Sequence, residues 1–127
     1  MYKRQIHRCQ TPALAFGASL DGFLDAKYWL AIEDDRVVGS CGLYFEDDPT
    51  EGWMGWFGVA AGYRKNGYGD TMLNHVERQA LKKGASRLSL WTGKSNTTAH
   101  KFYQARGFKL VGSNDTGKLI YSKRIVA

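Results

Sequence analysis

The segment that most constrains the fold is GVAAGYRKNGYGDT, at residues 58–71. It begins as the end of a strand, passes through Arg64 and Lys65, and enters a helical pattern at Gly67. Glycines at such a turn let the backbone approach a ligand, and the amides of a first helical turn attract an anion. Two glycines alone would also fit an ordinary strand-to-helix turn. The added basic pair favours a strand–loop–helix unit that binds phosphate.

Two known nucleotide-binding patterns fail on spacing. A dinucleotide site has the pattern G-x-G-x-x-G, but its third glycine would fall at Met72. The sequence TGKS at residues 92–95 resembles the end of a P-loop, but its leading glycine would have to be Leu88. The phosphate-bearing ligand is therefore of another kind.

Strands and helices mix around this segment, which is typical of an α+β, or mixed α/β, fold. Residues 11–24 form a weak helical stretch, and residues 28–33 and 37–45 form a hairpin that turns at 34–36. A helix is expected at 67–83, with Gly84 after its end. The remaining expected elements are strands at 53–59, 87–92, 108–112 and 119–126, and a helix that Asn96 caps and Gly107 ends.

The composition bounds the class of protein. The chain has 127 residues, 43% of them hydrophobic, which suits a single domain over residues 1–127. Cys9 and Cys41 are expected to be reduced core thiols, because they form no CxxC pair. The basic N-terminus lacks the apolar stretch of a signal peptide, and no run is long enough to span a membrane. We therefore expect a cytoplasmic protein with no metal site.

The net charge of +6 is unevenly distributed. Residues 1–63 carry five Lys or Arg against nine Asp or Glu, a balance of −4, whereas residues 64–127 carry thirteen against three, a balance of +10. The basic total alone makes nucleic acid the first partner to consider. The split instead favours an anionic ligand at the basic half, and a cationic one at the acidic half.

The second motif is N-x-x-A-x-x-F-Y-x-x-x-G-F, at residues 96–108. By itself it also fits a helix cap followed by core residues. Together with R-x-x-G-x-G at residues 64–69, it resembles the GNAT superfamily of N-acetyltransferases over about residues 53–112. The resemblance implies a GNAT-like fold, in which helices flank a central mixed, largely antiparallel sheet.

The resemblance also implies that acetyl-CoA is the co-substrate. Its pyrophosphate would bind the amides of the glycine turn, and its pantetheine arm would pair with the preceding strand by β-augmentation. The implied cofactor-binding residues are Phe57, Gly58, Val59, Arg64, Lys65, Asn66, Gly67, Tyr68, Gly69, Asp70, Thr71 and Asn96.

Tyr103 matches the position of the family's usual general acid, which would protonate the departing thiolate. Some members use a carboxylate near the start of the central strand as general base. Trp53 occupies the aligned position, so Glu51 is the first candidate here and Glu46 the second, although both also fit solvated loop charges. Trp53 and Trp56 could flank a cationic amine by cation–π contact.

The leading hypothesis is acetyl transfer from acetyl-CoA to a primary amine of a small molecule or peptide, by direct attack. The region before the hairpin is short for the family, so we expect a vestigial first strand and an acceptor wall completed by a second subunit or missing in part. An exposed edge at residues 119–126 would support a homodimer. The alternatives are a basic nucleic-acid-binding module, a tRNA-directed acetyltransferase, and a CoA-binding protein without catalysis.

Overall fold

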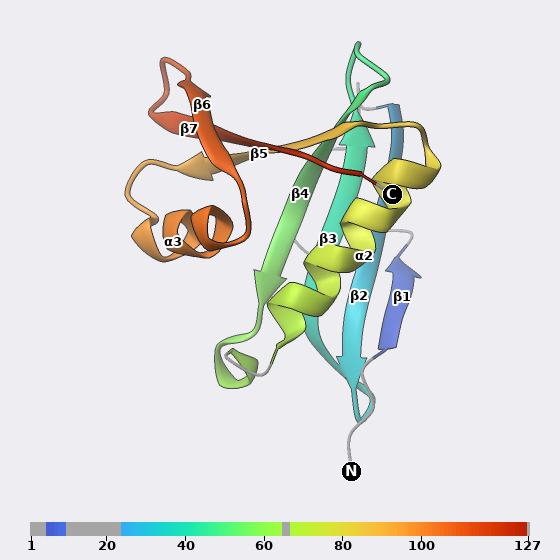
Figure 1. Cartoon of the computed structure of the whole chain (residues 1–127). Coiled ribbons are helices and arrows are strands. Elements are labelled where there is room, and N and C mark those ends of the chain that lie inside the picture. Colours follow the sequence, from blue (N-terminus) through green and yellow to red (C-terminus); the bar gives the residue numbers. More distant parts are fainter. Residues whose placement is uncertain (1–4, 10–23, 65–66, 127) are drawn as a thin grey trace.

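The computed structural model describes residues 5–9, 24–64 and 67–126. These residues form a seven-stranded mixed sheet in the order β1-β2-β3-β4-β5-β7-β6, with two α-helices packed against it (Figure 1). The strands are β1 (Gln5–Cys9), β2 (Leu24–Glu33), β3 (Arg36–Phe45), β4 (Glu51–Val59), β5 (Arg87–Gly93), β6 (Lys109–Ser113) and β7 (Lys118–Arg124). The helices are α2 (Tyr68–Lys82), α3 (Thr97–Ala105) and the short 3₁₀ turn η1 (Ala61–Tyr63).

The expected α+β architecture is confirmed. Within the described residues every strand pairing is antiparallel except that of β4 with β5, which is parallel. The hairpin of β2 and β3 turns on Asp34 and Asp35, whose φ angles are 48° and 65°. Two successive positive φ angles are typical of the type I′ turn, whose twist matches that of the strands that it joins.

The N-terminal part of the fold differs from the expectation. Residues 5–9 form β1, which pairs antiparallel with β2, where the sequence predicted only a vestigial strand. Strand β2 begins at Leu24, so the last residue of the expected helical stretch at 11–24 is in a strand. Residues 11–23 of that stretch lie outside the described residues.

Helix α2 covers one face of the sheet through the apolar residues that the sequence assigned to it. Met72, Val76 and Ala80 are fully buried against core side chains of the strands, and Gly84 ends the helical segment with a φ of 94°. We call this side of the sheet, which α3 also contacts, the inner face, and the opposite side the outer face. Cys41 is buried and free, as expected, and burial raises the pKa of its thiol to about 12.

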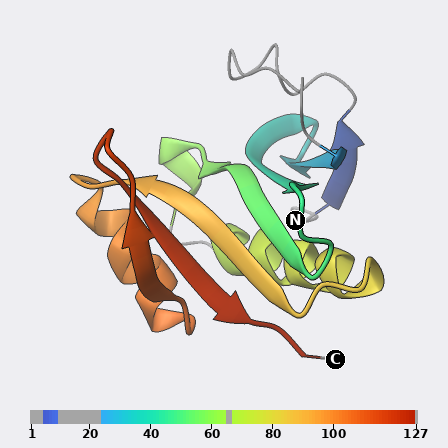
Figure 2. The same ribbon diagram turned by 90° about the horizontal axis from the view of Figure 1, so that it is seen from above.

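Strand β7 lies between β5 and β6, so it is not an edge strand (Figure 2). The expected exposed edge at 119–126 is therefore wrong, because backbone partners occupy both sides of β7. The edge at this end of the sheet is β6, on which Leu110 and Val111 are 54% and 62% exposed.

Candidate active site

Strands β4 and β5 pair over a short distance and then separate. Their register runs only from Glu51 opposite Arg87 to Met54 opposite Leu90, after which β5 turns away toward α3 (Figure 1). Trp56 lies just past this point with a φ of 51°, at an irregularity in the pairing of β3 with β4. Ser40 Oγ donates a hydrogen bond to the Trp56 carbonyl at 2.7 Å. The bulge bends β4 and opens a wedge between β4 and β5.

The second half of β4 directs backbone groups into this wedge. The Ala60 amide donates to the Val38 carbonyl of β3 at 2.7 Å. In an antiparallel ladder, alternate residues point their amide and carbonyl toward the same neighbour, so Val59 points its own groups away from β3. Arg64 Nε donates to the Val59 carbonyl at 3.3 Å, on the side that β5 has left. Val59 therefore offers its amide, and a carbonyl that Arg64 also contacts, to an extended amide-bearing ligand.

Helix α2 begins beside this end of β4, and its two glycines meet different needs. Gly67 precedes the helix with a φ of 84°, a left-handed conformation that favours glycine. Gly69 has an ordinary φ, but a Cβ there would lie 3.0 Å from the Phe102 ring of α3. The sequence predicted close ligand approach for both. The structure shows that Gly69 also allows α3 to pack against the start of α2.

The first turn of α2 points its amides out of the helix end. The first backbone bond of the helix runs from the Thr71 amide to the Gly67 carbonyl at 3.1 Å, and Thr71 Oγ1 donates to the same carbonyl at 3.0 Å. The amides of residues 68–70 precede this bond, so they form the positive end of the helix dipole. Arg64 is exposed nearby. Lys65 and Asn66, both expected to bind the cofactor, lie outside the described residues.

Asp70 uses its side chain within the protein. Its carboxylate forms a two-point ion pair with Arg106, in which Nε contacts Oδ1 and Nη2 donates to Oδ2 at 3.0 Å. The hydrogen bonds from Arg106 lower the pKa of the Asp70 carboxyl. The Arg106 guanidinium also lies 3.7 Å from the centre of the Phe102 ring. Asp70 is thus available to an anionic ligand only through its backbone amide.

Helix α3 places Tyr103 at the inner side of the wedge. Tyr103 is buried, and its ring centre lies 6.1 Å from that of Phe57 in β4 and 5.5 Å from that of Phe108. Burial raises the pKa of the Tyr103 phenol to about 12, so it keeps its proton at neutral pH. Asn96 caps α3 by accepting the Ala99 amide at 3.2 Å, and this contact occupies its side-chain oxygen.

Glu51 is the first residue of β4, three positions before Met54, where the two strands begin to separate. It precedes Phe57 by six positions, which is about 20 Å along a strand. Its Oε2 accepts a 2.6 Å hydrogen bond from Ser89 Oγ, which in turn lies 2.7 Å from Ser122 Oγ. The structure therefore does not bring Glu51 to Tyr103; its carboxylate instead links β4, β5 and β7 across the outer face.

A row of aromatic rings borders the wedge on the outer face. Gly52 and Met54 face α2 and the hydrophobic core, so Trp53 between them faces outward. Trp53 stacks on Trp91 of β5 with ring centres 5.8 Å apart, and on Tyr44 of β3 at 6.5 Å. The sequence pointed to Trp53 but missed Trp91. The only available signal was its outward position in the alternating strand RLSLWT.

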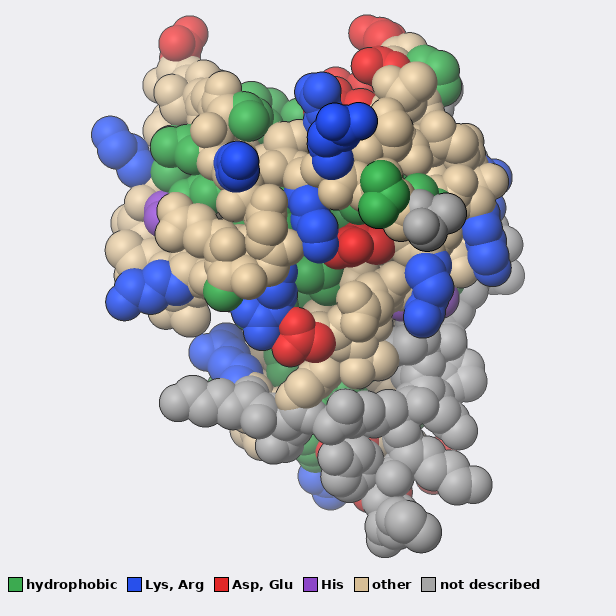
Figure 3. Space-filling model, in the orientation of Figure 1, with side chains coloured by type: hydrophobic (Ala, Val, Ile, Leu, Met, Phe, Trp, Pro, Cys, Tyr) green, Lys and Arg blue, Asp and Glu red, His purple; other side chains and the backbone are tan. Residues whose placement is uncertain are grey.

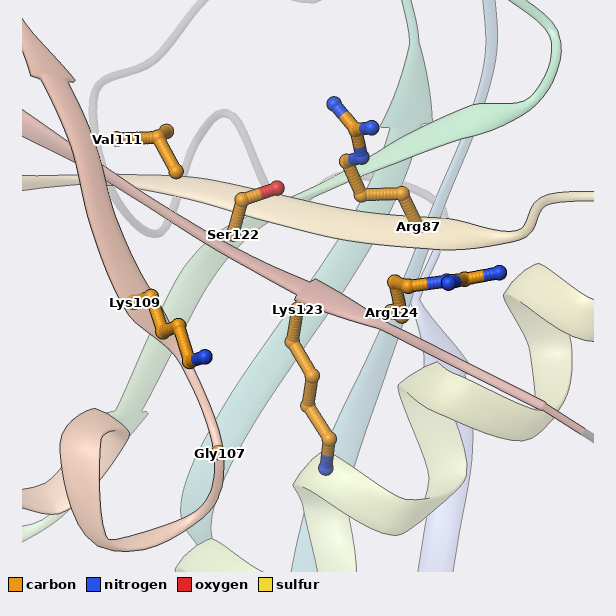
Figure 4. A pocket seen from close by; sticks show the side chains of 7 residues that line it. All are labelled: Arg87, Gly107, Lys109, Val111, Ser122, Lys123 and Arg124. Carbon is orange, nitrogen blue, oxygen red and sulfur yellow. The ribbon is translucent and has the colours of Figure 1, made fainter.

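A separate cleft lies between β6 and the end of β7, away from the wedge. It encloses about 490 Å³ and is lined by four cationic side chains (Figure 4). Arg87 and Arg124 are directly opposed in the strand register, and Lys123 is paired with Glu77 at 3.0 Å. Lys and Arg side chains are also spread over the face that carries α2 and α3 (Figure 3). The four cations of the cleft are Arg87, Lys109, Lys123 and Arg124.

Two other features are absent from the described part of the chain. Across residues 5–9, 24–64 and 67–126, no group of three or more His, Cys, Asp or Glu side chains is placed to hold a metal ion. No helix in this part of the chain is long and apolar enough to cross a membrane.

Comparison with known proteins identifies the family. Residues 4–108 match the profile of the Acetyltransferase (GNAT) family, and the chain belongs to this family. The uncharacterized N-acetyltransferase YsnE of Bacillus subtilis is 34% identical over 87 residues, which are 67% of this chain and 57% of YsnE. Human N-acetyltransferase 8 is 32% identical over 91 residues, 68% of this chain and 40% of that protein. The chain thus spans about half the length of these relatives.

Solved structures show the same fold. A GNAT family acetyltransferase from Elizabethkingia anophelis, whose crystal structure has acetyl-CoA bound, matches with a TM-score of 0.77. The two chains are 19% identical, and the match covers 96% of this chain and 98% of that one.

Proposed function

We propose that this protein is an acetyl-CoA-dependent N-acetyltransferase that acetylates a primary amine by direct attack. The observation that carries the proposal is the wedge between β4 and β5. The start of α2 lies at one end of the wedge, and the phenol ring of Tyr103 lies on its inner side. The two relatives described above bear the name N-acetyltransferase. The Elizabethkingia neighbour binds acetyl-CoA.

The residues present fit coenzyme A. The outward backbone groups of Val59, with Phe57 and Gly58 beside it, suit the amides of a pantetheine arm. The amides at the start of α2, after the left-handed Gly67, suit a pyrophosphate, and Arg64 adds a mobile positive charge. Lys65, Asn66, Tyr68, Gly69, Asp70 and Thr71 complete the proposed phosphate loop. Asn96 remains in the proposed set through its side-chain amide, because its oxygen caps α3.

Acetyl-CoA supplies an activated acetyl group as a thioester. Transfer forms a carbon–nitrogen bond to the acceptor, breaks the carbon–sulfur bond, moves one proton from nitrogen, and leaves one on sulfur. Tyr103 donates a hydrogen bond to the departing sulfur. Its pKa of about 12 exceeds the value of roughly 8.5 for an ordinary thiol, so complete transfer of its proton would be uphill. We therefore assign Tyr103 stabilisation of the leaving group, with the proton lost by nitrogen completing the thiol.

The proton acceptor is not assigned to Glu51. That carboxylate is engaged by Ser89 and lies at the far end of β4. The acceptor instead enters as the neutral amine, its ammonium proton having passed to water before attack, and the proton that nitrogen loses on transfer goes to the sulfur. The test is release of the CoA thiol from acetyl-CoA with a panel of primary amines. Turnover with an amine, matched by the acetylated product in mass spectrometry, supports transfer; thiol release without product, or none with any amine, contradicts it.

A second candidate is a phosphate-bearing acceptor such as an aminoacylated tRNA. The cleft lined by Arg87, Lys109, Lys123 and Arg124 favours it, because directly opposed cations gain from a bound anion. Salt-dependent retention of RNA, weakened in Lys109→Gln, would support this acceptor. If RNA is not retained at low salt, a small-molecule or peptide amine remains as the acceptor. The remaining alternative is a CoA-binding protein without catalysis. Release of the CoA thiol together with an acetylated amine would exclude it.

Assembly and location are part of the same proposal. We place the protein in the cytoplasm and expect a homodimer through the β6 edge, where Leu110 and Val111 are exposed. The mass in solution from light scattering tests the dimer. A monomer across the working concentration range would contradict it.

A further inference from the structure

The outer face of the sheet carries three stacked aromatic rings on three adjacent strands. Trp53 of β4 lies between Tyr44 of β3 and Trp91 of β5, with interplanar angles of 17° and 13°. Ring centres 5.8 Å and 6.5 Å apart are within the range of offset stacking. We call Tyr44, Trp53 and Trp91 the ring ladder.

The ring ladder ends at the point where the wedge opens. The last paired residues of β4 and β5 are Met54 and Leu90. Trp53 directly precedes the first of these and Trp91 directly follows the second, so the stacked indoles flank the site of separation. Tyr103 approaches the same wedge from the inner face through Phe57. A molecule bound on the outer face where the two strands separate would therefore lie beside the two indoles.

Trp91 is the most exposed ring of the ladder. Tyr44 is buried, Trp53 is half-buried, and Trp91 is 37% exposed, so burial decreases from β3 to β5. Ile120 of β7 is directly opposite Trp91 in the strand register, so β5 has cross-strand neighbours on both sides of the indole. The part of Trp91 that remains in water offers aromatic surface to a ligand, which can pack on it face-on or edge-on.

The charges nearby do not favour a cation as the group recognised. Arg87 and Ser89 are the outward neighbours of Trp91 on β5, and Ser89 already donates to Glu51. Glu46 lies near the other end of the ladder, where burial first and then the Glu46 charge raise the pKa of the Tyr44 phenol. The cation–π contact expected from Trp53 and Trp56 is therefore less well supported than ring stacking. Trp56 instead packs edge-on against Tyr28, with ring centres 4.4 Å apart.

We propose that the ring ladder is an acceptor subsite that selects amines bearing a planar aromatic ring, which packs against the exposed part of Trp91. This inference rests on the proposed acetyl transfer, since it names the acceptor class for the same wedge. Aromatic pairs contribute about 0.5–1.5 kcal/mol beyond area burial, which corresponds to roughly a two- to tenfold preference.

The test compares two amines of the same shape, 2-phenylethylamine and 2-cyclohexylethylamine. We expect kcat/KM to be roughly two- to tenfold higher for the phenyl compound in the wild type. Trp91→Leu should bring this ratio close to one, because it lowers kcat/KM for the phenyl compound more than for the cyclohexyl compound. Trp91→Phe, the matched control, should keep most of the preference. A wild-type ratio near one, or a preference that survives Trp91→Leu, would overturn the subsite.

A binding measurement separates this inference from the proposed function. The indole N–H signal of Trp91, assigned by its loss in Trp91→Leu, should shift on titration with 2-phenylethylamine more than with 2-cyclohexylethylamine. If both amines shift it equally, or neither does, the subsite is wrong even when acetyl transfer occurs. If only the phenyl compound shifts it and no amine is acetylated, the subsite stands and the proposed reaction fails.

Discussion

Asp70, in the first turn of α2, and Arg106, just after α3, hold the two helices together through a two-point ion pair. Arg106 Nη1 also donates to the Phe102 carbonyl at 3.0 Å, which fixes the guanidinium at the end of α3. Because α2 begins the proposed phosphate loop and α3 carries Tyr103, this pair sets the spacing between the two halves of the site.

We expect Asp70→Asn to weaken this link without unfolding the protein. Both side chains are partly exposed, so solvent screening limits the loss to about 0.5–1 kcal/mol in the free energy of unfolding. Since the pKa of Asp70 is lowered in the folded state, its contribution is complete above the ordinary value of 3.8 and is lost as the pH falls through the folded-state value. Urea unfolding at pH 7 and pH 3 tests this. An equal loss at both pH values would contradict it.

Gly69→Ala should destabilise the packing of α2 on α3. A Cβ at this position meets two atoms of the Phe102 ring at 3.0 Å, so the ring must move; we expect a loss of about 1–2 kcal/mol in the free energy of unfolding. Gly62→Ala is the matched control, because nothing lies within 4 Å of a Cβ there. Urea unfolding of both variants is the measurement. Equal stabilities would show that Gly69 is not constrained by α3.

Tyr103→Phe should lower kcat by about ten- to a hundredfold and leave the Kd for acetyl-CoA nearly unchanged. The phenol with its pKa of about 12 stays protonated, so the wild-type rate should show no decline from its ionisation below about pH 10. Steady-state kinetics with acetyl-CoA and a responsive amine test both points. An unchanged kcat in Tyr103→Phe would remove the tyrosine from the reaction and leave it a packing residue.

Glu51→Gln distinguishes a general base from a structural carboxylate. Because Glu51 is engaged by Ser89 and lies six residues before Phe57, beside which Tyr103 packs, we expect kcat to change less than threefold. The loss of a charged acceptor should cost about 1–2 kcal/mol in the free energy of unfolding. Ser89→Ala, which removes the donor, should give a similar loss. A folded Glu51→Gln variant with a kcat reduced a hundredfold would restore the base assignment.

The sequence predicted the elements around the two motifs well, because periodicity and glycine punctuation are local signals. The helix at Tyr68–Lys82 and the cap at Asn96 follow directly from neighbouring residues. Pairing between distant strands is not a local property. The sequence therefore placed residues 119–126 at an edge, whereas β7 lies inside the sheet. The same limit hid Trp91, whose role depends on its position beside Trp53 on another strand.

The same limit applies to single site residues: their local context could be interpreted from the sequence, but their long-range contacts could not. The basic glycine turn was recognised from its spacing, yet the reason for Gly69 lies in Phe102, which is distant in sequence. Glu51 was chosen for its position near the start of a strand. Its hydrogen bond to Ser89 could not be predicted, because it depends on the register of β4 with β5.

The central claim is that the wedge and the start of α2 bind acetyl-CoA. Hydrogen exchange of the backbone amides with and without acetyl-CoA tests it most directly. We predict protection of residues 57–59 and 64–71, a rise in Tm, and reduced protection in Arg64→Gln. Exchange at these amides that is unchanged by saturating acetyl-CoA, with no shift in Tm, would contradict the account.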